Sequence, residues 1–472
     1  MAQKVKNNSV DSLKAGIWYT VCNFLIKGLG FLTTPIFSRL LLKKDFGTVG
    51  NFNSWLSILA IVGTLHLYSS VARAKYEFED DFDGYLSSVV FLGSVYSAVL
   101  YGIVLLFPHF FEIVFDMDMR YIHVIFWVLI FSPALDMMQI KHRFEYKYKF
   151  FVFVSLSSTI ISTAIAVLLV LNLDDKLWGR IYGAFVPNIL IYIIFFFVIL
   201  FKGKTFYNKE YWKFALTFTM PIIPHLLANV ILGSSDKIMI TKLVGSEANA
   251  IYTIAYSLGM LVATLQTSFN SAMCPWLYEK LHAKDYEIIK KVNRVYILTF
   301  AVAVEGMILI APELVRFIGG KEYASSVYLI APVMIGYGFK FAYNLYINVE
   351  QYEKKTGIAS VGTLVSAGFN FVTNLIFIPI FGYQAAAYTT LASFILLLLI
   401  HYFVSKRLDL VHMYDNVFTF ACMFIMMIIG IASQILYLNT MLRYGAIVIL
   451  GIVGVGLLWK LYITFKPGAD FR

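Results

Sequence analysis

The chain has 472 residues, of which 60% are hydrophobic and 14% are charged, and its mean hydropathy is +0.75. A chain this apolar is not a soluble protein, and it has no hydrophilic stretch long enough to fold as a separate catalytic domain. Its net charge of +10 does not point to nucleic acid as a partner, because in a membrane protein Lys and Arg collect in the loops of one side.

Runs of mostly apolar residues recur along the whole chain, and their length of about 20 residues is what an α-helix needs to cross a bilayer. A transmembrane β-barrel would show alternating segments of about ten residues instead. We therefore predict an all-α, polytopic membrane protein with about 14 transmembrane helices. The predicted spans are 16–38, 51–72, 86–108, 121–140, 150–171, 180–201, 214–241, 249–273, 292–311, 325–348, 358–379, 384–405, 416–437 and 442–463.

The first apolar segment is too long for the hydrophobic region of a signal peptide, so we expect it to be kept as the first span. When the amino terminus is placed in the cytoplasm, most Lys and Arg residues fall on the cytoplasmic side, as the positive-inside rule requires. This pattern predicts that both termini are cytoplasmic. The most basic loop, 280–294, is expected to contact anionic membrane lipids.

An internal repeat supports this count of spans. Three pairs of segments match at offsets of about 205 residues, namely 38–59 with 241–261, 143–147 with 351–355, and 178–180 with 381–383. We therefore predict a six-helix bundle in 1–201, a second bundle in 202–407, and two additional transmembrane helices in 408–472. Six spans per repeat give both bundles the same orientation, so an axis along the membrane normal is expected to relate them.

The seventh span carries polar residues that lipid would not tolerate. At about 100° per residue, His225, Asn229 and Asp236 fall within roughly an 80° arc of one helix face. A charge inside a membrane segment costs about 2.5 kcal/mol or more, so it usually faces a cavity or a partner. Pro221 and Pro224 each remove a backbone donor in the same span, and we expect them to bend the helix and serve as a hinge.

Similar polar stripes occur on the first span, on the eighth span with Gln266 and Asn270, and on the tenth span with Lys340, Asn344 and Asn348. We predict that these spans line one wet cavity together with the seventh. The predicted cavity residues are Asn23, Lys27, Arg73, His225, Asn229, Asp236, Lys237, Lys340 and Asn344. Other interpretations stay open. Polar side chains in membrane helices often form hydrogen bonds between helices, worth about 0.6 kcal/mol each. Lys237 could pair across helices or reach the interface, and Arg73 could be an ordinary positive-inside anchor.

Three residues are candidates for ion coupling: Asp236, Glu305 and His225. Glu305 stands alone on an otherwise apolar ninth span, where it would bind a proton or cation or pair with a cavity lysine. His225 could titrate near neutral pH, or it could be a satisfied histidine behind Pro224.

No motif for a nucleotide-binding loop or a zinc protease is present, and the three cysteines lie far apart within predicted spans. We therefore expect no cofactor and no metal site.

The motifs resemble those of Wzx-type polysaccharide flippases, within the MATE-like superfamily of multidrug, oligosaccharidyl-lipid and polysaccharide exporters. The motif residues are Pro221, Pro224, His225, Ser234, Asp236, Lys237, Ile240, Ile251, Tyr252, Ala255 and Tyr256 around the seventh span; Lys27, Gly28, Leu29, Gly30, Phe31, Pro35, Ser38, Arg39, Leu40, Phe46 and Gly47 near the start; and Lys355, Thr356, Asn370, Asn374, Ile378, Pro379, Phe381, Gly382, Ala385, Ala386 and Ala387 late in the repeat.

The resemblance implies a transporter of the bacterial inner membrane and not an enzyme. It would move an undecaprenyl-diphosphate-linked oligosaccharide by alternating access, in the biosynthesis of O-antigen (lipopolysaccharide), capsule or exopolysaccharide. The implied partners are this glycan lipid, membrane lipids, a proton or sodium ion, and a polymerase with its chain-length regulator. The family often carries arginines in its cavity, whereas this chain offers mainly lysines there.

Two alternative functions stay open. A cation-coupled exporter of drugs or other small molecules would use Asp236 or Glu305 as the coupling carboxylate, although the predicted cavity is more basic than acidic. A membrane polysaccharide polymerase would usually have a long outer loop with catalytic residues, and every predicted outer loop here is short.

Overall fold

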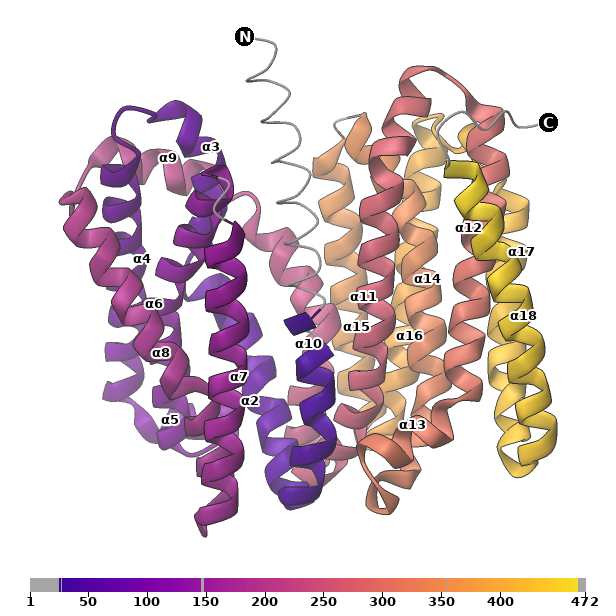
Figure 1. Ribbon diagram of the computed structural model, residues 1–472, viewed down its shortest axis with the longest axis horizontal. Coiled ribbons are helices and arrows are strands. Elements are labelled where there is room, and N and C mark those ends of the chain that lie inside the picture. Colours follow the sequence, from indigo (N-terminus) through magenta and orange to yellow (C-terminus); the bar gives the residue numbers. More distant parts are fainter. Residues whose placement is uncertain (1–24, 27, 146–147, 354, 466–472) are drawn as a thin grey trace. The chain divides into compact units, whose positions relative to one another are not determined.

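The computed structural model describes residues 25–26, 28–145, 148–353 and 355–465, and Figure 1 shows it as a ribbon. Every regular element in these ranges is a helix, and none of them is a strand. Eleven of the described helices are long and apolar enough to cross a membrane, or thirteen spans result if each of two bent helix pairs counts as one. The protein is therefore an all-α polytopic membrane protein, as predicted. Part of the first predicted span, 16–38, lies outside the described residues.

The chain divides into two compact units, Met1–Ala250 and Ile251–Arg472, and in each of them the long helices run side by side as a bundle (Figure 1). The first unit contains α2 (Lys43–Val62), η1 (Leu67–Ser70), α3 (Val71–Glu77), α4 (Phe82–Leu106), α5 (Pro108–Phe115), α6 (Met119–Phe144), α7 (Tyr148–Asn172), α8 (Lys176–Gly203), α9 (Lys209–Thr219) and α10 (Ile223–Leu243).

The boundary between the units falls near the start of α11 (Ser246–His282). The second unit continues with α12 (Tyr286–Leu309), α13 (Ala311–Ile318), η2 (Lys321–Ser326), α14 (Val327–Tyr352), α15 (Thr356–Phe381), α16 (Gln384–Arg407), η3 (Val411–Met413), α17 (Asn416–Ala432), η4 (Ser433–Leu438) and α18 (Thr440–Phe465). The division into 1–201, 202–407 and 408–472 stays a prediction.

The second predicted span is broken. We expected one helix over 51–72, but α2 ends at Val62 and the chain resumes helical structure at η1, with a bend of 50° between the two parts. Leu65 and His66 in the break have φ angles of 51° and 48°, a region that costs about 1–2 kcal/mol per residue for side chains other than Gly. The freed carbonyl of Gly63 accepts a hydrogen bond from the Ser97 hydroxyl at 2.6 Å, so the break is satisfied from α4.

The seventh predicted span is also bent, by 49° between α9 and α10. Pro221 lies in the break, and Pro224 lies in the first turn of α10. A proline in a first helical turn gives up no intrahelical hydrogen bond, whereas one inside a helix would. The two prolines therefore lie at the bend where the sequence predicts one.

The core of the first unit lies where α4, α6, α8 and α9 meet η1 and α3. Ser70 and Tyr85 exchange a hydrogen bond of 2.7 Å in this core. At one end of the bundle, Lys141 of α6 and Lys202 of α8 both contact the carboxylate of Asp83 at the start of α4. A shared carboxylate thus joins the ends of three helices.

The second unit is built around α14, which is buried along most of its length and packs against α12, α15, α16 and α17. The rings of Phe300 on α12 and Phe341 on α14 stack with their centroids 3.7 Å apart. Of the two additional helices, α17 packs against both α12 and α14, and α18 packs against α12. Arg443 of α18 forms an ion pair with Glu313 of α13.

Candidate functional site

The predicted polar face of α10 is only partly open. Asn229 donates a hydrogen bond to the backbone oxygen of His225 at 3.0 Å, and its amide nitrogen also lies 3.2 Å from the Nε2 atom of that histidine. Asp236 is buried, with 1% of its surface exposed, while Lys237 is half-buried. This face therefore combines hydrogen bonds within the helix with a buried carboxylate.

Two of the predicted cavity residues, Asn23 and Lys27, lie outside the described residues. A third, Arg73, is exposed on α3. That exposure fits a cavity residue and an interfacial anchor equally well. A role of these three side chains at the substrate stays a prediction.

Lys340 and Asn344 lie on α14 of the second unit and are half-buried. The ammonium group of Lys340 lies 5.2 Å from the ring centroid of Phe394 and 5.9 Å from that of Tyr337, within the range of a cation–π interaction. The backbone oxygen of Lys340 accepts a hydrogen bond from Gln266 of α11 at 3.2 Å.

A polar seam joins α11 and α14 inside the second unit. About two turns after Lys340, the amide of Asn348 donates to Asn270 of α11 at 2.7 Å. The predicted stripes of the eighth and tenth spans therefore do meet. That this seam and the polar face of α10 line one cavity stays a prediction.

Glu305 on α12 has a different environment. Its side chain is 5% exposed, and neither carboxylate oxygen has a hydrogen-bond partner in the described part of the chain. A Cβ atom placed on Gly430 of α17 would lie 3.2 Å from Oε1, and it would also meet Ile308 and Ile335. A carboxylate enclosed by apolar groups in this way favours the neutral form or a bound cation.

A third buried carboxylate, Glu350 near the end of α14, is not among the residues that the sequence singled out. Its Oε2 atom lies 2.8 Å from Nδ1 of His401 on α16, and Ser405 donates to its Oε1 atom at 3.0 Å. All three side chains are buried. A signal for this cluster existed, because His401 and Ser405 are four residues apart and share one face of their helix. Glu350, however, lies beyond the predicted end of the tenth span.

The asparagines of the late family motif form hydrogen bonds with other side chains of the bundle. Asn370 of α15 donates to Thr390 of α16 at 3.1 Å, and Asn374 donates to Asn370 at 3.2 Å. Thr389 donates in turn to Asn374. These buried hydrogen bonds join α15 to α16. Polar side chains in membrane helices often serve in this way.

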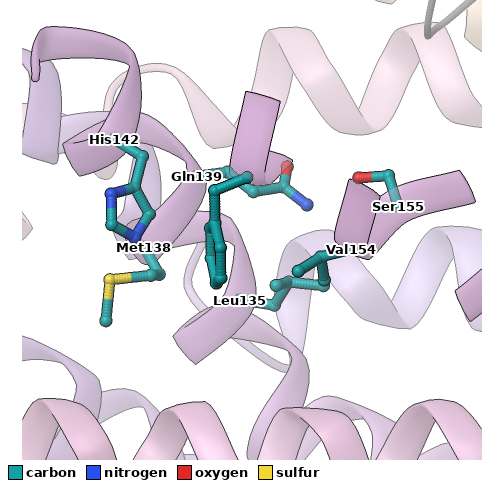
Figure 2. A pocket seen from close by; sticks show the side chains of 7 residues that line it. Leu135, Met138, Gln139, His142, Val154 and Ser155 are labelled. Carbon is teal, nitrogen blue, oxygen red and sulfur yellow. The ribbon is translucent and has the colours of Figure 1, made fainter. Parts of the chain in front are cut away.

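A pocket between α6 and α7 in the first unit is too small for a substrate. Figure 2 shows His142 and Gln139 on one side of it and Val154 and Ser155 on the other. Its volume is about 10 Å³, which is room for about one water molecule. Within the ranges that the structure covers, no group of three His, Cys, Asp or Glu side chains is placed to hold a metal ion.

Comparison with known proteins decides the family. The profile of the family described as "Polysaccharide biosynthesis protein" matches residues 12–281, which is more than half of the chain. This chain belongs to that family. The resemblance seen in its motifs is thereby confirmed.

One protein that is similar in sequence is a putative protein of the Lsg locus of Haemophilus influenzae. It is 23% identical over 78% of this chain and 94% of its own length. Among solved structures, the lipid II flippase MurJ in an inward closed conformation superposes with a TM-score of 0.67 at 14% identity, over 95% of this chain and 100% of that one. An inward-facing multidrug resistance MATE transporter of the MOP superfamily gives a TM-score of 0.55 at 13% identity, over 82% and 94% of the two chains. The shared feature at these identities is the fold.

Proposed function

We propose that this member of the polysaccharide biosynthesis family is a flippase. It carries an undecaprenyl-diphosphate-linked oligosaccharide repeat unit from the cytoplasmic to the outer leaflet of the bacterial inner membrane, in the biosynthesis of O-antigen, capsule or exopolysaccharide. The observation that carries the proposal is the family match over residues 12–281. The fold shared with a lipid II flippase supports it, because that protein's name also describes the movement of a lipid-linked substrate.

The chemistry of the substrate fits the predicted cavity. A diphosphate and hydrophilic sugars need a wet, basic passage, while a polyprenyl tail is stable in lipid. Positive charge would be supplied by Lys27, Arg73, Lys237 and Lys340. Asn23, Asn229, Asn344, His225 and Asp236 would offer hydrogen bonds to hydroxyl groups of the sugars, with Pro221 and Pro224 as the hinge.

The transport cycle would be alternating access between two six-helix bundles, 1–201 and 202–407, with 408–472 as additional helices. In this arrangement both termini are cytoplasmic, and a polymerase with its chain-length regulator would receive the flipped unit on the outer side. A proton or sodium ion bound at Glu305, or at Asp236 or His225, would drive the cycle.

A cation-coupled exporter of small molecules is a second candidate. It is favoured by one observation, the partnerless carboxyl group of Glu305 in the described structure, because a carboxylate inside a membrane helix commonly marks an ion or proton pathway. The likeness to a multidrug transporter agrees with this candidate in fold alone.

Deleting the gene and assaying lipid-linked glycan by leaflet distinguishes the two candidates. For the flippase, we expect repeat units to accumulate on polyprenyl diphosphate in the cytoplasmic leaflet and surface polysaccharide to disappear, both restored by the wild-type chain. Unchanged surface polysaccharide together with increased sensitivity to cationic drugs would reject the flippase and favour the exporter.

A further inference from the structure

The cluster of Glu350, His401 and Ser405 forms a closed hydrogen-bonded unit in the second unit of the chain. The Oε2 atom of Glu350 is hydrogen-bonded to Nδ1 of His401 at 2.8 Å, and its Oε1 atom accepts a hydrogen bond from the hydroxyl of Ser405 at 3.0 Å. We take the arrangement in which the Glu350 carboxylate is ionised, so that His401 carries a proton on Nδ1 and donates it to Oε2. His401 and Glu350 are both 0% exposed.

The other ring nitrogen of His401 has no partner among the described residues. It points at α15, where a Cβ atom placed on Gly362 would lie 2.8 Å from Nε2. The backbone of α15 therefore passes directly over this nitrogen, and only glycine allows that approach. No carbonyl oxygen or hydroxyl group of the described residues forms a hydrogen bond with Nε2 there.

Few other titratable groups face the pair. From α14, the ring of Tyr343 packs against the imidazole with the centroids 4.7 Å apart. From α15, the described side chain beside Gly362 is Thr363, which does not titrate. From α16, the carboxylate is contacted by His401 itself and by Ser405, whose hydroxyl does not titrate near neutral pH. The pair thus carries a net negative charge when His401 is neutral and no net charge when it is protonated.

Protonation of His401 has two opposite effects on this buried pair. A buried net charge is unfavourable, so uptake of a proton at Nε2 stabilises the pair as imidazolium and carboxylate. The new N–H group would then point at the backbone of α15 without an acceptor, and a buried unsatisfied donor is itself unfavourable. Both requirements are met only if α15 moves away from α14 and α16 and lets water reach Nε2.

We propose that Glu350 and His401 form a proton-binding site whose occupancy loosens the contact of α15 with α14 and α16. The site binds one proton, at Nε2 of His401, and releases it when α15 packs back. Glu350 is two residues from the end of α14, an end that the predicted topology places in the cytoplasm, so the proton exchanges with that side. The use of this proton in transport rests on the proposed function, but the linkage between proton and packing does not.

Hydrogen–deuterium exchange on the purified full-length protein in lipid nanodiscs tests the linkage without any substrate. After correction for intrinsic exchange rates, we expect the backbone amides of residues 360–367 to exchange about tenfold faster at pH 5.5 than at pH 8, since an unsatisfied donor shifts such an equilibrium by roughly that factor. The variant His401→Asn should lose this pH response. The matched control His412→Asn should keep it, because the side chain of His412 is 46% exposed.

Two further measurements keep the proposal falsifiable if His401→Asn does not fold. Nitrogen NMR of labelled histidine in the wild-type protein should show a protonated Nδ1 and a bare Nε2 at pH 8, and both nitrogens protonated at pH 5.5. The variant Gly362→Ala should speed exchange in 360–367 at both pH values. The proposal is overturned by wild-type exchange that does not depend on pH, or by a response that persists in His401→Asn. Failure of the flippase assay would leave these results unaffected.

Discussion

Charged side chains inside the helices differ in what surrounds them. Lys340 faces two aromatic rings, Glu350 is hydrogen-bonded to His401 and Ser405, and Glu305 has no hydrogen-bond partner in the described structure. A buried charge is tolerated in proportion to the polar contacts it makes. Glu350 therefore has polar contacts that offset its burial, whereas Glu305 has no hydrogen bond to do so among the described residues.

Asp236 and Lys340 are the predicted cavity residues that can be tested most directly. We expect Asp236→Asn and Lys340→Ala each to abolish surface polysaccharide, because the first removes a buried charge and the second removes a cation available to a diphosphate. Immunoblotting of membranes should show normal insertion of both variants. Lys340→Arg is the matched control, since it keeps the charge over Phe394, and it should retain most activity. Normal polysaccharide in Asp236→Asn and Lys340→Ala would reject the cavity assignment.

Asp415 gives a prediction that depends on pH. It lies just before α17 and accepts a hydrogen bond from the backbone N–H of Phe418 at 3.1 Å. That bond, and then the guanidinium of Arg294, hold the pKa of Asp415 below its usual range. A carboxyl group whose folded pKa is lower than its unfolded pKa, about 3.9, stabilises the fold above that pH and ceases to do so as the pH falls.

We therefore expect the start of α17 to exchange amide hydrogens faster as the pH falls below about 4, in the range where the carboxylate is protonated. Asp415→Ala should raise exchange there at neutral pH, because loss of a helix cap costs about 1 kcal/mol. Asp415→Asn keeps an acceptor for the Phe418 N–H and serves as the control. Hydrogen–deuterium exchange of residues 416–420 measures both effects, and equal exchange in wild type and Asp415→Ala would contradict this role.

At the scale of helices, α2 closely approaches the chain that follows α10. A Cβ atom placed on Gly47 would lie 1.7 Å from the backbone oxygen of Ser246, and Asn249 donates to the Gly47 oxygen at 2.8 Å. Backbone atoms cannot move aside as a flexible side chain can. The glycine is therefore required by packing, and the similarity of this segment to the family opening has a physical cause.

We expect Gly47→Ala to lower stability by about 1–3 kcal/mol, the usual effect of forcing extra volume into a packed site. The melting temperature of the purified protein in detergent should fall accordingly. Gly102→Ala on α4 is the control, because a Cβ atom there meets nothing within 4 Å and alanine favours the helix. Equal melting temperatures for Gly47→Ala and the control would show that the segment after α10 can shift freely.

Two of the membrane-spanning helices are broken, and the sequence predicted only one of the breaks. The bend between α9 and α10 contains Pro221, which cannot continue a hydrogen-bonded helix. The break after α2 has no proline and no glycine at its two left-handed residues, Leu65 and His66, and a leucine is not expected in that conformation. A contact from α4 through Ser97 compensates the second break, and such a contact is not visible in local sequence.

At the scale of the whole molecule, thirteen of the predicted spans coincide with a described helix or a bent helix pair. This agreement follows from the hydrophobic thickness of a bilayer, which requires the same length of apolar chain for each crossing. The orientation of these spans, with both termini in the cytoplasm, rests on the distribution of Lys and Arg and stays a prediction.

Single cysteines test the orientation in intact cells, on a background where Cys22, Cys274 and Cys422 are replaced by alanine. We expect Asp174→Cys, exposed between α7 and α8, to react with a thiol reagent that does not cross the inner membrane. Ala283→Cys, exposed between α11 and α12, should react only after the membrane is made permeable, since the positive-inside rule places its basic loop in the cytoplasm. The opposite pattern at either position would reverse the predicted topology.

The sequence by itself determined the class of protein, the positions of the spans and the family. Each of these depends on local composition or on short motifs, and the cost of placing polar groups in lipid makes that local signal strong. The polar faces of the eighth and tenth spans were also visible, because helical periodicity alone assigns residues to a face.

Only the tertiary structure decided which of those polar side chains meet. Glu350 and His401 are 51 residues apart in the chain, and Gly47 and Asn249 are 202 apart. Periodicity defines the face of a single helix, but it does not say which neighbour covers that face or at what height. The packing of α14 against α15 and α16 makes that choice, and it placed a histidine, a carboxylate and a glycine together at one buried point.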